Sequence, residues 1–316
     1  MIRALRPTDL PAYVEFCRQI SVARTNDNRA VSSAVPTVRS FWSHSLALEP
    51  GREAWVQIEH GHISGLVSAK HREGADVWHV DQLLILPSAD AGRTCTRLLE
   101  HLLTAAADEG IQKVFLRLTV VDPALEWANR AGFFQYCTEY VYALPEVPTF
   151  AHLAAVARLR PRRASDHQSL FQLYCAAVPF RVRQAEGMTL HEWRWTDGWQ
   201  VHHLGFPLSF RAARRQDYVV ETAPRLSGWL QVERGSRRVG ILMNPEEAHD
   251  VDGLLRFGLA RLGSGGAADC VVRDYQPAVL TSLEDYHFRE VGHYSLLARA
   301  LAVRIPEAKL VPIRAS

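Results

Sequence analysis

The chain has 316 residues, of which 47% are hydrophobic and 22% are charged, and its formal net charge is +2. The length is sufficient for two domains of ordinary size, and the composition fits a folded globular protein rather than a disordered one. So small a net charge gives no argument for binding nucleic acid or a membrane surface, and no apolar run reaches the roughly 18 residues that a membrane-spanning helix needs.

In chain order, strand and helix patterns alternate through the first half. The pattern predicts a strand, two helices, three strands, a helix, a strand, a helix and a last strand, at 2–6, 9–23, 34–47, 53–59, 62–70, 77–86, 92–109, 112–120, 122–131 and 133–144. The run "VWHVDQLLIL" alternates at its start and is apolar at its end, which is typical of a central strand covered on both faces.

The second half repeats the first. The stretches "IRALRPTD" at 2–9 and "LRPRRASD" at 159–166 align without a gap, and their arginines and final aspartates coincide. Later, "LLILPSADAG" and "VGILMNPEEA" each place a proline after an apolar strand, before a helical pattern that ends in glycine. We therefore predict two tandem copies of one module, as domains 1–148 and 149–316, divided within "PEVPTFAHLAAVA".

The second copy adds an aromatic stretch to the shared pattern. Its helices are predicted at 165–178 and near 188–197, and "RLSGWLQVERGSRRVGILMN" predicts two strands around a turn. The stretch "WRWTDGWQVHHLGFPLSF" fits either core packing or the wall of a substrate cleft. As a wall, it would suit an apolar or aromatic acceptor through Trp193, Trp195, Trp199 and Phe206.

Cysteine and histidine usage gives no indication of a disulfide framework or a metal site. The five cysteines are scattered without a CxxC pair, and no signal peptide precedes them, which is typical of a reduced, cytoplasmic protein. The 14 histidines show neither HxxxH nor HExxH spacing, so no metal site is expected.

The element order resembles the GCN5-related N-acetyltransferases, the GNAT family, over nearly all of both halves. The resemblance rests on this order, on the strand–proline–loop–helix unit, and on the Gly132-Phe133 pair before the last strand. It implies an α/β fold (an α+β mixed sheet), with a twisted mixed sheet flanked by helices in each half. The fourth and fifth strands would separate around the pantetheine arm of acetyl-CoA, and the next helix start would hold the pyrophosphate.

By this resemblance, the loop "PSADAGRTCTRLL" has the family length and belongs to the cofactor site. Asp90 stands where the family has Arg or Gln, and would repel a pyrophosphate unless Arg93 or Arg97 offsets its charge. The implied cofactor contacts are Leu84, Ile85, Leu86, Ala91, Gly92, Arg93, Thr94, Cys95 and Thr96.

The C-terminal loop departs further from the family pattern. Its leucine pair arrives two residues early, and acidic residues crowd the helix start, where they complement the helix dipole without a ligand. We therefore expect no acetyl-CoA in the C-terminal domain. The acidic residues are Glu246, Glu247, Asp250 and Asp252.

The candidate catalytic residues are Asp81, Tyr136 and Tyr140. Asp81, on the fourth strand, is a candidate base with a raised pKa; the alternative is an exposed acid, or one bound to a neighbouring arginine. Tyr136, Tyr140 and Tyr142 alternate along the last strand, which predicts one shared face, either at the site or in packing. The tyrosine that the family often carries before the Gly-Phe pair is replaced by Ala128 and Leu283.

Two functional hypotheses remain open. The first is an acyl-CoA-dependent N-acyltransferase that moves acetyl from acetyl-CoA, held in the N-terminal domain, to an amine on a small molecule or peptide. The second is a catalytically inactive tandem module that binds a small molecule or a protein partner. Neither involves nucleic acid or membrane, and a monomer or a homodimer is expected.

Overall fold

The computed structural model describes residues 1–26, 51–72, 76–150, 156, 158–190, 193 and 215–302. The strands are β1 (Ile2–Ala4), β2 (Arg52–Glu59), β3 (His62–His71), β4 (Val77–Ile85), β5 (Lys113–Thr119), β6 (Phe134–Leu144), β7 (Leu159–Pro161), β8 (Arg215–Thr222), β9 (Arg225–Glu233), β10 (Arg238–Met243), β11 (Ala268–Arg273) and β12 (Arg289–Ala300). The α-helices are α1 (Leu10–Asn26), α3 (Ala91–Asp108), α4 (Ala124–Arg130), α5 (His167–Ala177), α6 (Phe180–Glu186), α8 (Val251–Leu262) and α9 (Pro277–Asp285).

The predicted elements of the first half are confirmed to within a few residues, apart from helix 34–47, which lies outside the described residues. In the second half, the β9–β10 hairpin and the run from α8 to β12 are confirmed, whereas β8 and α6 were missed. The predicted helix 165–178 ends early because Val178 precedes Pro179 and is extended, at φ −99° and ψ 127°.

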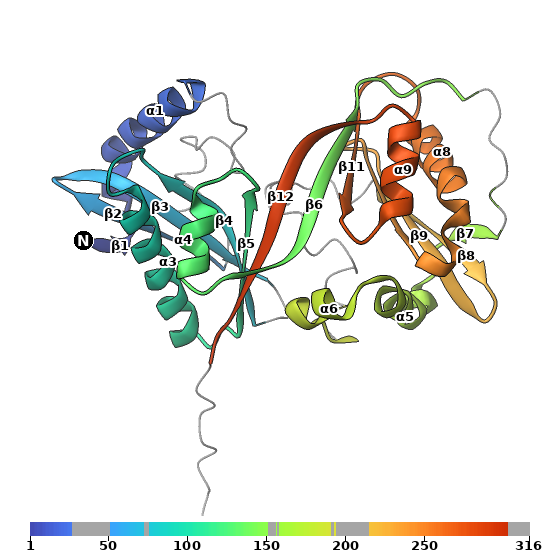
Figure 1. The fold of residues 1–316 in the computed structure, drawn as a ribbon, viewed down its shortest axis with the longest axis horizontal. Coiled ribbons are helices and arrows are strands. Elements are labelled where there is room, and N and C mark those ends of the chain that lie inside the picture. The colour runs from blue at the N-terminus through green and yellow to red at the C-terminus, as the bar shows by residue number, and fades with distance from the viewer. Residues whose placement is uncertain are drawn as a thin grey trace, which may run out of the picture.

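All the strands belong to one sheet, in the order β1-β2-β3-β4-β5-β12-β6-β11-β10-β9-β8-β7. The two halves therefore exchange their last strands, and β6 and β12 run side by side between them (Figure 1). Strand β12 pairs antiparallel with β5, from Tyr294↔Thr119 to Ala300↔Lys113. Strand β6 pairs antiparallel with β11, from Ala268↔Leu144 to Arg273↔Glu139. The sheet is therefore continuous across the predicted domain boundary at residue 148.

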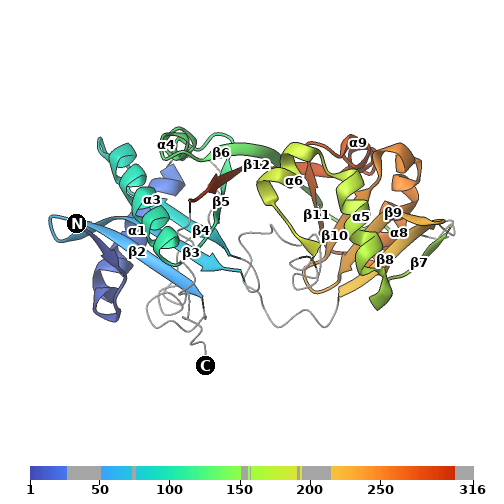
Figure 2. The same ribbon diagram turned by 90° about the horizontal axis from the view of Figure 1, so that it is seen from below.

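Helices cover both faces of this sheet in each half (Figures 1 and 2). In the N-terminal half, α3 and α4 pack on one face, where Leu98 and Leu102 are fully buried, and α1 packs on the other through Tyr13 and Phe16. In the C-terminal half, α8 and α9 pack on one face, and α5 and α6 on the other.

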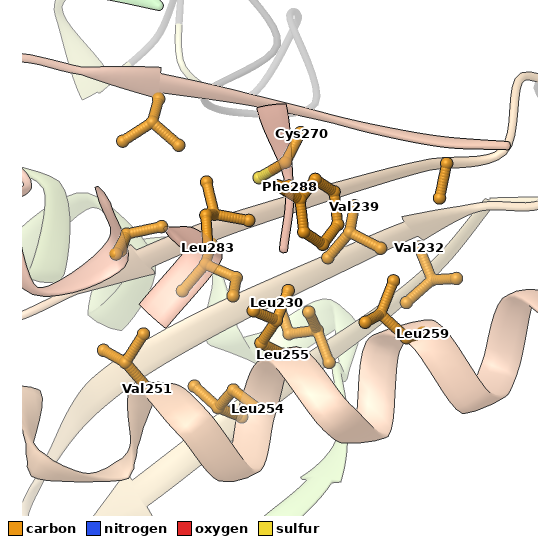
Figure 3. Close-up of a cluster of buried hydrophobic side chains, with 14 of the residues drawn as sticks. Leu230, Val232, Val239, Val251, Leu254, Leu255, Leu259, Cys270, Leu283 and Phe288 are labelled. Carbon is orange, nitrogen blue, oxygen red and sulfur yellow. The ribbon is translucent and has the colours of Figure 1, made fainter. Parts of the chain in front are cut away.

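Apolar side chains from helix and strand converge under α8 (Figure 3). This cluster joins Leu254, Leu255 and Leu259 of α8 to Leu230 of β9 and Cys270 of β11, all of them fully buried. Burying leucine-sized side chains contributes about 1.5–3 kcal/mol each to stability, so this face is a sufficient reason for α8 to dock here.

The repeat seen in the sequence is also a structural repeat. Arg3 donates two hydrogen bonds to the Asp9 carboxylate, both at 2.6 Å, and Asp9 accepts another from the Arg6 amide. In the second half, Arg160 donates to Asp166 at 2.7 and 2.9 Å, and the Arg163 amide repeats the third bond. Each carboxylate therefore ties its first strand to the short 3-10 turn before its first long helix.

Candidate functional site

The sheet separates between β4 and β5. These parallel strands pair from Val77↔Lys113 to Val80↔Leu116, and the pairing stops there. Strand β4 continues to Ile85 and β5 to Thr119, so the two strands form an opening beyond Val80. This gap between β4 and β5 is the N-terminal opening. Separated strands present backbone N–H and C=O groups that need other partners.

A β-bulge shapes β4 where the opening begins. Ser68 of β3 pairs with Gln82 and Ala69 pairs with Val80, which leaves Asp81 as the extra residue. The bulge changes the phase of the strand: Val80 and Leu83 pack with α3, whereas Leu84 packs with α1. Bulges re-aim side chains, and this one turns Asp81 toward Ser68.

Asp81 is bound on both carboxylate oxygens. Ser68 Oγ donates to Oδ1 at 2.6 Å, and the guanidinium of Arg52 on β2 forms an ion pair with Oδ2. The side chains of Arg52 and Asp81 are 15% and 12% exposed. Of the two alternatives for Asp81, the structure shows the acid bound to a neighbouring arginine; its role as a base stays a prediction.

Two further polar side chains lie next to Asp81. Gln82 is 9% exposed, and within the described part of the chain its Oε1 accepts no hydrogen bond. His79 is buried, and its ring stacks on Phe115 of β5 with centroids 5.2 Å apart. Sequence reasoning missed Arg52, Ser68 and Gln82, because their proximity to Asp81 depends on pairing across three strands and on a bulge that no local pattern signals.

The first turn of α3 offers backbone donors. The Ala91 amide donates to Ser88 and the Thr94 amide to Asp90, at 3.2 and 2.9 Å. Within the described residues, the amides of Gly92 and Arg93 have no backbone acceptor. Asp90 and Arg93 are exposed. These two amides, with the positive end of the helix dipole, can bind an anion.

Several of the side chains predicted to touch the cofactor point elsewhere. Thr94 is 2% exposed and accepts a hydrogen bond from Gln57 Nε2 at 3.1 Å, and Thr96 donates to the Gly92 carbonyl at 3.0 Å. Cys95 is fully buried, and burial raises the pKa of its thiol to about 12. Thr94 and Cys95 can therefore contact a ligand only through their backbone, and the hydroxyl proton of Thr96 is already donated to Gly92.

The remaining predicted contacts divide by exposure. Leu84 is buried in the core beneath α1, and Ile85 and Leu86 are half-buried at the end of the strand. Ala91 and Gly92 are half-buried at the helix start. Among the predicted contacts, Arg93 is therefore the one that the structure leaves exposed.

Gly92 is required by packing. A Cβ atom at this position would lie 2.6 Å from Nε1 of Trp127 on α4. The sequence reading assigned this glycine to a phosphate loop; in the structure, its absent side chain lets α3 and α4 approach each other.

The prediction that three alternating tyrosines share a face is wrong. Tyr136 is the extra residue of a bulge in β6, between the pairs Leu296↔Cys137 and Leu297↔Gln135. It is buried in the core under α5 and α6, and burial raises the pKa of its hydroxyl well above the usual value. Tyr140 and Tyr142 pack instead with the core under α8 and α9. The bulge shifts the alternation that the sequence pattern assumed.

The other candidate residues are core residues or lie outside the described residues. Ala128 and Leu283, at the family's tyrosine position, are both fully buried. Trp193 is buried against Tyr174 and Trp229, at centroid distances of 5.2 and 5.9 Å. The predicted cleft residues Trp195, Trp199 and Phe206 lie outside the described residues, as does most of helix 188–197.

Comparison with known proteins identifies the family. Residues 21–133 match the model of the acetyltransferase (GNAT) family. Residues 21–133 therefore form a GNAT domain. The match covers the strand opening and the start of α3, so the site described above lies in the part of the chain that the family model recognises.

Solved structures extend the fold to both halves. A GCN5-related N-acetyltransferase from Sphaerobacter thermophilus is 16% identical, with 96% of each chain covered and a TM-score of 0.57. A putative acetyltransferase from Pyrococcus horikoshii is 12% identical, with 96% of this chain and 90% of that chain covered and a TM-score of 0.50. A search of the curated proteins found no match.

The family that residues 21–133 match is a family of acetyltransferases, a class that acts on amine acceptors. None of the helices in the described ranges combines the length and apolar character that a membrane crossing requires.

Proposed function

We propose that the N-terminal half transfers an acetyl group from acetyl-CoA to an amine. The observation that carries this proposal is the opening beyond the pair Val80–Leu116, with the first turn of α3 following six residues after β4. An extended chain in the opening and an anion at the helix start would both find backbone partners there.

The residues present fit a coenzyme A ester. The pantetheine arm would lie along β4 beyond Val80, and the amides of Gly92 and Arg93 would hold the pyrophosphate, helped by the Arg93 guanidinium. Asp90 is exposed and forms no ion pair in the described residues, so its charge weakens this site without blocking it. When bound, acetyl-CoA supplies an activated acyl thioester.

The polar side chains around the β4 bulge would bind the acceptor amine and accept its proton. We assign Asp81 the role of accepting a proton from the amine, directly or through water, while Arg52 and Ser68 fix its orientation. The free acceptor lone pairs of Gln82 Oε1 suit an N–H of the same amine. This places proton acceptor and amine ligand on one strand, at the mouth of the opening.

The second candidate is a module without catalysis. Its support is that both oxygens of Asp81 are already engaged, and that both positions of the family's tyrosine are buried alanine or leucine. The two candidates differ in turnover: both allow a ligand in the N-terminal opening, and the enzyme alone releases free thiol.

Thermal melting with acetyl-CoA, followed by a thiol-release assay with an amine panel, tests the proposal. A ligand at 100 times its Kd stabilises a protein by about 2.7 kcal/mol. We expect Arg93→Glu to weaken the stabilisation and Asp90→Asn to strengthen it, because both exposed side chains lie at the start of α3. Absence of any shift at millimolar acetyl-CoA would contradict the proposal; a shift without thiol release would favour the second candidate.

A further inference from the structure

The sheet has a second opening, between β10 and β11, which a side chain of the protein itself closes. Parallel pairing there ends at Val239↔Cys270. Gln276, just before α9, is 6% exposed. Its Nε2 donates to the carbonyl oxygen of Ile241 on β10 at 2.7 Å, and its Oε1 accepts from the Arg273 amide of β11 at 3.4 Å. One side-chain amide thus joins the two separated strands.

The equivalent residue in the N-terminal half is Asp122. Its amide donates to the Thr119 carbonyl at 3.0 Å, as the Gln276 amide does to the Arg273 carbonyl at 2.9 Å, and each of the two residues precedes a proline. The Asp122 side chain, however, accepts from the amide of Ala124, the first residue of α4, at 2.8 Å. An ionised carboxylate has no N–H to give to a strand carbonyl, so Asp122 cannot do what Gln276 does.

The chemistry of the bridge indicates what it replaces. A buried carbonyl needs a donor, and leaving one without a partner costs about 1–3 kcal/mol. Ile241 lies at the edge of β10 that faces the opening and is 1% exposed. An amide-bearing chain entering the opening would present one N–H and one C=O to the two strands, and the Gln276 side chain presents the same pair.

We propose that Gln276 occupies the C-terminal opening in place of an amide-bearing ligand, and so restricts the protein to one cofactor site. The identity of that ligand, the pantetheine arm of an acyl-CoA, rests on the proposed function; the closure rests on the two hydrogen bonds. Gln276 is thus a specificity-determining residue: it decides which of the two equivalent openings is free.

Calorimetric titration of the full chain with pantetheine tests this. Pantetheine lacks phosphate groups, so the acidic residues Glu246 and Glu247 after β10 do not repel it. We expect Gln276→Ala to bind one more equivalent than the wild type. The control is Gln231→Ala, which removes an equally buried glutamine from β9 of the same half and is expected to add none.

The counts separate this inference from the proposed function. If the wild type binds one equivalent of pantetheine and Gln276→Ala binds two, both the closure and the N-terminal site are supported. If the wild type binds none and Gln276→Ala binds one, the closure is supported but the N-terminal site is not. Equal counts in the two proteins overturn the inference.

If Gln276→Ala does not fold, the variant Gln276→Glu provides an independent test. It keeps the size of the side chain but, when ionised, places a carboxylate against the Ile241 carbonyl; Arg273 beside it is already paired with Glu186 at 2.5 Å. Its melting temperature should fall below that of the wild type at about pH 8 and recover at about pH 5, where the protonated acid donates again. A deficit that is the same at both pH values would overturn the inference.

Discussion

Asp81 is the extra residue of the β-bulge in β4, and this bulge determines where its side chain points. The bulge turns its carboxylate toward Ser68, and Arg52 completes a group drawn from three neighbouring strands. Its position on the fourth strand was predictable from sequence because the hydrophobic run "VWHVDQLLIL" identifies that strand. Its partners were not, since a bulge and a three-strand register depend on tertiary pairing.

We predict that Asp81→Asn lowers kcat by about 10²–10⁴-fold, the usual contribution of a general base, with little change in the KM for acetyl-CoA. Steady-state kinetics of the folded variant checks this. Asp108→Asn, at an exposed position at the end of α3, is the control and should match the wild type. A loss below twofold for Asp81→Asn would assign the proton transfer to another group.

Glu53, which lies outside the candidate site, has a raised pKa that makes the stability of the protein depend on pH. Burial, together with the neighbouring Glu109 carboxyl, raises the pKa of Glu53 from 4.5 to about 7. Between these values the folded protein holds a proton that the unfolded chain has lost, so stability falls as the pH rises through this window.

Glu53→Gln removes that penalty and should raise the melting temperature at pH 8 but not at pH 4. The control is Glu100→Gln, at an exposed position on α3, and its effect should not depend on pH. A Glu53→Gln effect of equal size at both pH values would show that Glu53 keeps an ordinary pKa in the fold.

At the scale of elements, the contact between α3 and α4 explains a residue that the sequence reading assigned to phosphate binding. Gly92 lies against the indole of Trp127, so the small residue there serves helix packing. Sequence spacing placed the loop and the helix start correctly, to within a residue. Sequence spacing could not distinguish a glycine required by a ligand from one required by a neighbouring helix, because both requirements select glycine at the same position.

Gly92→Ala should destabilise the protein by about 1–3 kcal/mol, as overpacking does, because the new Cβ would meet Trp127 at 2.6 Å. Trp127→Ala removes the obstacle, so the same substitution in that background should cost much less. Thermal unfolding of the four proteins measures the difference. If Gly92→Ala costs the same in both backgrounds, the glycine is not held by Trp127.

At the scale of the whole molecule, the exchange of β6 and β12 makes the two halves one sheet. The tandem repeat was readable from sequence because strand, cap and helix recur at nearly equal spacing. The exchange of β6 and β12 could not be predicted from sequence. The repeat gives each half a last strand of the same kind, and either strand fits the sequence pattern of either half. Only the packed structure decides which half receives which strand.

The exchange predicts that neither half folds alone. Residues 1–148 expressed without β12 would expose the edges of β5 and β6, and exposed edges promote aggregation. We expect this fragment to be insoluble or associated, and to become soluble when residues 149–316 are co-expressed. Size-exclusion chromatography of the separate and co-expressed fragments gives the answer; a folded, monomeric 1–148 would contradict the role of β12.

The central claim is that this protein holds acetyl-CoA in its N-terminal opening and keeps the C-terminal opening closed. Amide hydrogen exchange with and without saturating acetyl-CoA tests both parts in one experiment, because bound backbone amides exchange more slowly. We predict new protection over residues 82–86 and at residues 92 and 93, with no change over residues 240–252. Protection over 240–252, or none anywhere, would contradict the account.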